Sequence, residues 1–98
     1  MNRLNIKDRL LLANLSDKIQ IHQASTNEMK QFLDIIKSTG ENNYFQLQKY
    51  LQVAGYSSVE EFEHHFKDRQ SKEFWEGLAK IGGAVLIGYE LYQLLKKK

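Results

Sequence analysis

The stretch from residue 75 to residue 98 constrains the fold of this chain more than any other. Between Leu78 and Leu95 its only charged residues are Lys80 and Glu90, and residues 81–89 carry no charge at all. A helix this apolar has to be covered, either by the rest of the chain or by a partner. What covers it is therefore both the structural and the functional question.

Three glycines make the same stretch a weak helix in isolation. Gly82, Gly83 and Gly88 each disfavour a helix by about 1 kcal/mol relative to alanine. Close packing against another helix is the usual compensation, and Ala79 with Gly83, or Ala84 with Gly88, has the small-residue spacing that permits it. We therefore expect a close helix contact along this stretch.

Two apolar seams run along the C-terminal helix. One has alternating three- and four-residue steps, as in a helix that pairs with others. The second, Ala84, Ile87, Leu91 and Leu94, lies on a different side. A helix with two apolar sides is typical of a bundle centre or a subunit interface. The candidate interaction residues are those of the first seam with a flanking tryptophan: Trp75, Leu78, Ile81, Val85, Gly88, Tyr92 and Leu95.

The rest of the chain has a helical pattern as well. It has no proline, and apolar residues do not alternate with polar ones over the length of a strand. We predict an all-α fold, in which residues 1–98 form a single helical domain. It is a small bundle of four to five helices with a long apolar C-terminal helix at residues 71–98, which is a candidate oligomerisation element.

Capping residues predict the ends of the first three helices. The first helix is expected over about residues 6–23. Ser25 and Glu28 have the spacing of a capping box at the start of the second. Gly40 is placed to end that helix, and Asn42 or Asn43 can cap the third.

The fourth helix has a strong start signal as well. Ser57 and Ser58 each have a glutamate three residues on, so two capping boxes overlap there. Whether this helix runs on into the C-terminal helix is left open by the sequence. A break near Gln70 is favoured, with Ser71 as the cap of a separate fifth helix.

Composition limits the classes of partner and compartment. With 14 basic and 12 acidic residues, the formal net charge is only +2, which gives no bias towards nucleic acid. The chain has no cysteine, so it has neither disulfides nor thiolate chemistry, which suits a reducing cytoplasm. The first residues are too charged for a signal peptide, and we expect a cytoplasmic protein.

The sequence offers little for catalysis. Glu61, His64 and His65 have metal-ligand spacing on one helix face, but a single turn supplies too few ligands and is better explained as a solvated face. There is no nucleophile elbow and no phosphate-binding glycine loop. We expect no enzyme, no cofactor, no metal and no small-molecule substrate.

The segment from Leu47 to Lys67 is predicted to be helix, glycine turn, helix. Its residues Gly55-Tyr56-Ser57-Ser58, Phe62 and Phe66-Lys67 resemble the second half of the helix-turn-helix of AraC-type regulators, over about a fifth of the chain. The resemblance implies a second helix that enters the major groove. Here the positions of that helix that would face the DNA are occupied by Glu60, Glu61 and Glu63, which DNA phosphates would repel.

The function that the sequence favours is binding to another protein. We expect a small accessory protein, of a kind common in bacteria and phages, which acts through its C-terminal helix and self-associates as a homo-oligomer. Two alternatives remain. One is a DNA-binding regulator built on residues 47–67. The other is a peripheral membrane protein that uses residues 75–98, with their aromatic residues and lysines at 96–98, on anionic lipid.

Overall fold

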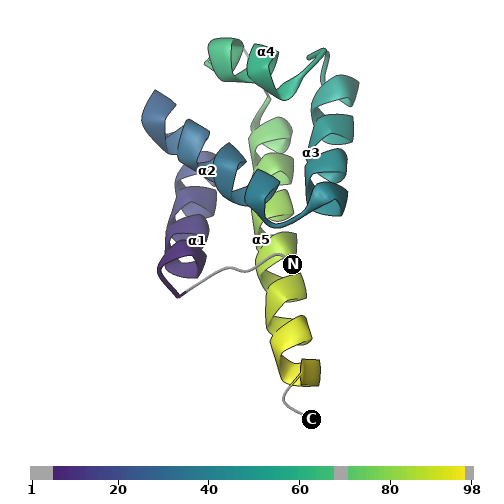
Figure 1. Cartoon of the computed structure of the whole chain (residues 1–98). Coiled ribbons are helices and arrows are strands. Elements are labelled where there is room, and N and C mark those ends of the chain that lie inside the picture. The colour runs from purple at the N-terminus through teal and green to yellow at the C-terminus, as the bar shows by residue number, and fades with distance from the viewer. Residues whose placement is uncertain (1–5, 68–70, 97–98) are drawn as a thin grey trace.

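The computed structural model describes residues 6–67 and 71–96, and only the backbone at residues 89, 90, 92–94 and 96. In this part of the chain every regular element is a helix, so the all-α prediction is confirmed. The helices are α1 (Ile6–Gln20), α2 (Thr26–Ser38), α3 (Glu41–Val53), α4 (Val59–His65) and α5 (Lys72–Lys96) (Figure 1).

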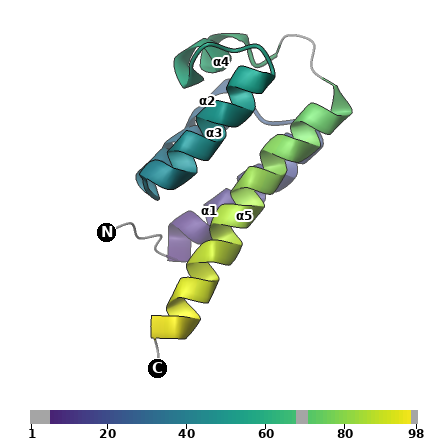
Figure 2. The ribbon, with the colours of Figure 1, turned by 90° about the vertical axis from the view of Figure 1, so that its right-hand side faces the viewer.

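The helices are arranged around α5. It runs antiparallel to α1, along which it makes its most extensive contact, and it also contacts α2 and α3 (Figure 1). The short helix α4 crosses the end of the bundle where α5 begins. In Figure 2 the C-terminal turns of α5 extend beyond the start of α1, so the molecule is elongated, with extents of 46 × 23 × 21 Å.

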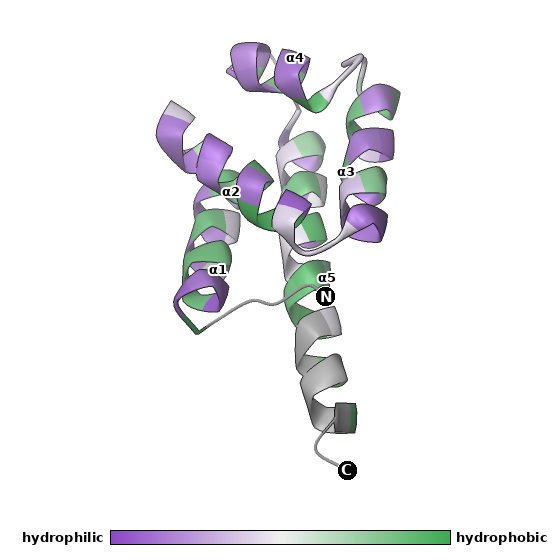
Figure 3. Ribbon diagram, viewed as in Figure 1, coloured by the Kyte–Doolittle hydropathy of each residue, from purple (hydrophilic) through white to green (hydrophobic). Residues whose placement is uncertain are grey.

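The core lies between the inward faces of the five helices. Helical periodicity places one apolar stripe along α2 and another along α4 and the residue that follows it. Both stripes are buried, and their residues are Met29, Phe32, Leu33, Ile36, Val59, Phe62 and Phe66. In Figure 3 the outward parts of α2 and α4 are hydrophilic, while hydrophobic residues are prominent on α5. The side chains that lose all or nearly all contact with solvent are Phe32, Phe62, Leu12, Leu15, Ile19, Met29, Leu33, Ile36, Leu47, Leu51 and Leu78.

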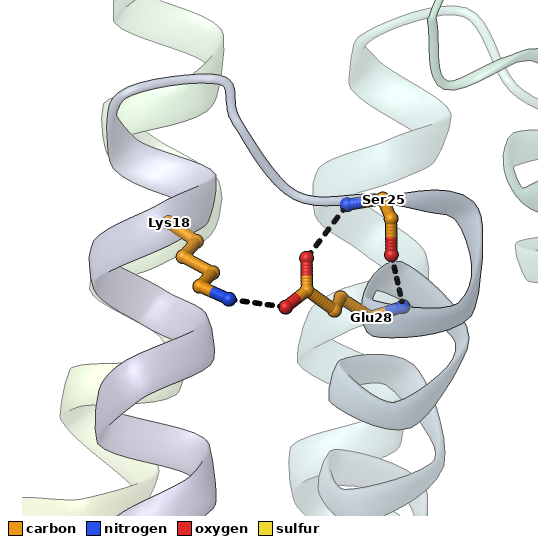
Figure 4. A network of polar contacts seen from close by, with 3 residues as sticks. All are labelled: Lys18, Ser25 and Glu28. Carbon is orange, nitrogen blue, oxygen red and sulfur yellow. Dashed lines mark hydrogen bonds and ion pairs between the residues drawn. The ribbon is translucent and has the colours of Figure 1, made fainter.

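The predicted capping box at the start of α2 is present. The Glu28 amide donates to Ser25 Oγ at 3.1 Å, and the Ser25 amide donates to Glu28 Oε1 at 2.9 Å. The other carboxylate oxygen of Glu28 forms an ion pair with Lys18 of α1 (Figure 4). The cap therefore also ties the first helix to the second.

Serine side chains cap the starts of both α4 and α5. Ser58 Oγ accepts a hydrogen bond from the Glu61 amide at 3.0 Å, while the Glu61 carboxylate reaches back to the amide and hydroxyl of Ser57. Ser71 Oγ accepts from the Phe74 amide at 3.1 Å, as predicted for a separate fifth helix. The break predicted near Gln70 falls outside the described residues.

The prediction that Asn42 or Asn43 caps α3 is wrong. The helix begins at Glu41, and Gly40 is the N-cap residue, with a φ of 135° that glycine adopts without strain. The Asn43 side chain instead donates to Thr39 Oγ1 at 2.8 Å. Because glycine turns the chain at this point, the helix starts before either asparagine.

The first helix ends earlier than predicted, at Gln20. The His22 amide donates to the Ile19 carbonyl at 2.9 Å and the Gln23 amide donates to the Lys18 carbonyl at 2.8 Å, which is the bonding of a Schellman motif. His22 takes the left-handed position of that motif, with a φ of 58°. Glycine normally occupies this position, because it has no Cβ that would clash at a positive φ.

Candidate interaction surface

The first apolar seam of α5 is divided along its length. In the N-terminal half Trp75, Leu78 and Val85 are 2%, 0% and 7% exposed, and Ile81 packs against the core from a partly buried position. In the C-terminal half Gly88 and Leu95 are exposed. The Tyr92 side chain lies outside the described part. The described candidate residues are thus buried or partly buried up to Val85 and exposed at Gly88 and Leu95.

The second apolar seam is the more exposed one among the described side chains, and the side chain of its last member, Leu94, lies outside the described part. Ala84 faces solvent, and the side chains of Ile87 and Leu91 are 61% and 55% exposed. Leu95, one turn further, is 70% exposed. We call Ala84, Ile87, Leu91 and Leu95 the distal stripe. Their spacing of three or four residues places them along one side of α5.

The glycines of α5 fall into two kinds. A Cβ on Gly77 would be 2.4 Å from Tyr50 Oη, and one on Gly82 would be 2.3 Å from Ser16 Oγ, so both allow a close approach within the chain. Among the described residues, no atom outside the adjoining helical backbone lies within 4 Å of the Cβ position of Gly83 or Gly88. Of the three glycines singled out in the sequence, Gly82 therefore makes the expected close contact, whereas Gly83 and Gly88 make none with the described residues.

A groove runs between α1 and α5, and we call it the α1–α5 groove. Its middle is lined by small residues, Ala13 and Ser16 from α1 and Ala79 and Gly83 from α5. Towards the start of α1 it is lined by Arg9 and continues over three large apolar side chains. These are Ile6, Leu10 and Leu86, of which Ile6 and Leu10 are 67% and 68% exposed.

The other end of the α1–α5 groove is polar. It is lined by Asp17 and Gln20 of α1 and by Glu76 and Lys80 of α5. The groove therefore changes from largely apolar to polar along its length, and its polar end has two carboxylates and one lysine. Small residues at its centre leave room for large side chains from outside.

The environment of Trp75 was not predicted in full. Its indole stacks on His22, with ring centroids 4.2 Å apart and planes 22° from parallel. On other sides it contacts Phe62, Phe66 and Phe74. Trp75 is therefore a core residue in this chain, and no sequence signal connected it with His22.

The segment formed by α3 and α4, which resembles part of a helix-turn-helix, has an acidic outward side on α4. Gly55 makes the turn with a φ of 106°, and α4 turns Val59, Phe62 and Phe66 into the core. Its outward side carries exposed Glu60 and Glu61. Carboxylates at these positions would repel phosphates.

Within the described residues, no three histidine, aspartate or glutamate side chains are grouped so that they could hold a metal ion. Likewise, none of the helices that the structure describes is long and apolar enough to cross a membrane.

Comparison of the chain with protein-family models, with curated proteins and with solved structures found no match. Functional inference therefore rests on the distal stripe, the open glycines and the α1–α5 groove.

Proposed function

We propose that this chain is a non-enzymatic interaction protein that binds another protein, and in the first place a second copy of itself, through the C-terminal half of α5. The proposal takes residues 71–98 as one long apolar helix. Its N-terminal half completes the core of its own chain, and its C-terminal half presents the distal stripe to a partner.

The observation that carries the proposal is the pairing of open glycines with exposed apolar side chains. Gly83 and Gly88 weaken the helix by about 1 kcal/mol each, and none of the described side chains packs closely on them. Ile87, Leu91 and Leu95, next to them, are all more than half exposed. A helix packed on this side would bury the apolar area and use the close approach that glycine permits.

Single exposed apolar residues elsewhere do not carry the same argument. Ile21, Phe45 and Val53 are 62%, 54% and 90% exposed, but Ile21 follows α1, while Phe45 and Val53 lie eight residues apart on α3. Isolated apolar residues are normal on protein surfaces, whereas a continuous apolar strip is a common mark of an interface. This difference supplies the control for the experiment.

The test is the molar mass of the full-length chain by light scattering over a concentration series. We expect a dimer or larger assembly, and we expect Leu91→Lys to raise its dissociation constant by at least about tenfold, because burying a leucine contributes about 1.5–3 kcal/mol. Val53→Lys is the matched control and should leave the mass unchanged.

A wild-type chain that stays monomeric at all concentrations would overturn self-association. Full-length variants are needed because Trp75 and Leu78 belong to the core, so a truncation before α5 would remove part of the fold. Binding of the same variants to anionic vesicles, measured in parallel, tests the lipid alternative.

A further inference from the structure

We infer that the self-associated form is a two-fold pair in which the exposed sides of two α5 helices lie antiparallel and cross midway between Ile87 and Gly88. This pair rests on the self-association proposed above, and it adds a direction and a register. Its surface is the distal stripe with Gly88, extended towards the start of α5 by the exposed Lys80. Because a two-fold interface uses the same surface on both copies, every contact in it occurs twice.

This surface lies on the side of α5 that faces away from the core. Successive residues of an α-helix are about 100° apart around its axis, so Leu91 points away from the side that carries Gly82, nine residues earlier. Gly82 packs against α1 and α2, whereas Leu91 is 55% exposed. Lys80 and Ala84, on the same side as Leu91, are exposed as well. A second helix can therefore lie along this side without displacing any of the described helices.

The sizes of the side chains indicate the register. With the crossing between Ile87 and Gly88, these two residues of opposite copies face each other, and Leu91 then lies opposite Ala84. Ile87 and Leu91 are large and more than half exposed. The Cβ position of Gly88 is open among the described residues, and Ala84 is small and exposed. Each large side chain therefore meets a small one, as a knob meets a hole, and the four-residue spacing of the small residues permits a close approach.

The same register places Leu95 opposite Lys80. Leu95 is 70% exposed, and the aliphatic part of a lysine can cover such a side chain while its ammonium group stays in water. Lys80 also lines the polar end of the α1–α5 groove, together with Asp17 and Glu76. Its charged end therefore has carboxylates nearby, and all three large side chains of the distal stripe gain a neighbour.

The antiparallel direction follows from the same residues. In a parallel two-fold pair every residue would meet its own counterpart, so that leucine would face leucine and Gly88 would face Gly88. Gaps would then remain beside the small residues, and their lining would lose packing contacts. A parallel pair would also set two Lys80 side chains beside each other, and like charges at short distance repel. The antiparallel pair avoids both costs.

The contact surface of this pair is small. It has far fewer residues on each copy than the roughly 20–30 of a standard stable interface, so we expect reversible association. A covalent trap is the suitable probe of such a pair. Because the chain has no cysteine, single cysteines introduced at chosen positions can report the register, since a disulfide forms only where two Cα atoms come within about 7 Å.

The test mixes full-length chains that each carry one cysteine and a different mass tag. Under mild oxidation we expect Leu95→Cys and Lys80→Cys to cross-link with each other. Neither should cross-link with itself, because its own counterpart lies about 22 Å away along the helix axis. Val53→Cys on α3 gives the background. Self-cross-linking of both variants, without cross-linking in the mixture, would overturn the antiparallel direction.

Ala84→Cys distinguishes this register from a neighbouring one. A crossing two residues further along α5 would place Leu95 opposite Ala84, whereas the inferred crossing places Leu91 there. Leu91→Cys should therefore cross-link with Ala84→Cys more efficiently than Leu95→Cys does, and the reverse order would overturn the register. Background cross-linking in every mixture, for a wild-type chain that associates, would overturn pairing through this side of α5. A wild-type chain that never associates would instead overturn the proposed function itself.

Discussion

Gly82 of α5 lies against Ser16 of α1 so closely that a Cβ on the glycine would be 2.3 Å from the serine Oγ. The same Cβ would be 2.8 Å from the Cε1 atom of Phe32, a fully buried ring. The adjacent Gly83 has open space at its Cβ position. Packing within the chain therefore requires a glycine at position 82 but not at position 83.

This contrast predicts opposite effects of two alanine substitutions. Gly82→Ala should lower the free energy of unfolding by about 1–3 kcal/mol, since Phe32 has no room to move aside. Gly83→Ala should raise it by up to about 1 kcal/mol, because alanine favours the helix. Urea unfolding of dilute protein, followed by the fluorescence of Trp75, measures both. A Gly82→Ala chain as stable as the wild type would contradict the close approach.

Tyr50 joins α3 to the start of α5, because its hydroxyl donates to the Phe74 carbonyl at an oxygen–oxygen distance of 2.6 Å. Burial raises the pKa of the Tyr50 hydroxyl. We expect Tyr50→Phe to lower the free energy of unfolding by about 1 kcal/mol, the usual effect of one lost hydrogen bond. Tyr44→Phe, which removes a hydroxyl outside this contact, is the control, and an equal loss in both variants would speak against a specific bond.

The cap of α2 predicts a dependence of stability on acid. Hydrogen bonds from Lys18 and from the Ser25 amide hold the pKa of Glu28 below its ordinary value of 4.5. The unfolded chain therefore binds the proton more readily, and the stabilising contribution of Glu28 is present above about pH 4.5 and is lost as the pH falls through the lowered pKa.

In Glu28→Gln the urea midpoint should consequently fall less steeply between pH 5 and about pH 2 than in the wild type. Glu63→Gln, a change in α4 outside both caps, should keep the wild-type slope. If the two variants showed the same slope, Glu28 would not be the group responsible.

The left-handed backbone of His22 can be tested apart from its ring. His22→Ala and His22→Gly both remove the stacking on Trp75, so the difference between them reports the backbone alone. The glycine variant should be more stable by about 1 kcal/mol, because a Cβ is unfavourable at a positive φ. Thermal unfolding monitored by circular dichroism is sufficient, and equal melting temperatures would exclude a left-handed residue here.

Signals that act over three or four residues were predicted correctly from the sequence. The caps at Ser25, Ser58 and Ser71 bind amides three residues further along the chain, so the local spacing identifies them. The buried stripes of α2 and α4 follow from helical periodicity in the same way. The five-helix organisation rests on these local features.

Contacts between distant segments could not be predicted in this manner. Nothing in the sequence distinguishes Gly82 from Gly83, and their difference arises from what α1 and α2 bring against one side of α5. Tyr50 and Phe74 are 24 residues apart, and His22 adopts a conformation that usually indicates glycine. The division of α5 into covered and exposed sides has the same origin, because it depends on the lengths and directions of the other helices.

The close approaches along α5 also limit how this sequence can diverge over evolutionary time. At position 77 any Cβ would meet the Tyr50 hydroxyl, and at position 82 it would meet Ser16 and Phe32. Chains that descend from the same ancestor should therefore retain two glycines five residues apart in their last helix, even after the surface of that helix has changed. Such a pair, preceded by a buried tryptophan, would identify distant relatives better than overall sequence identity.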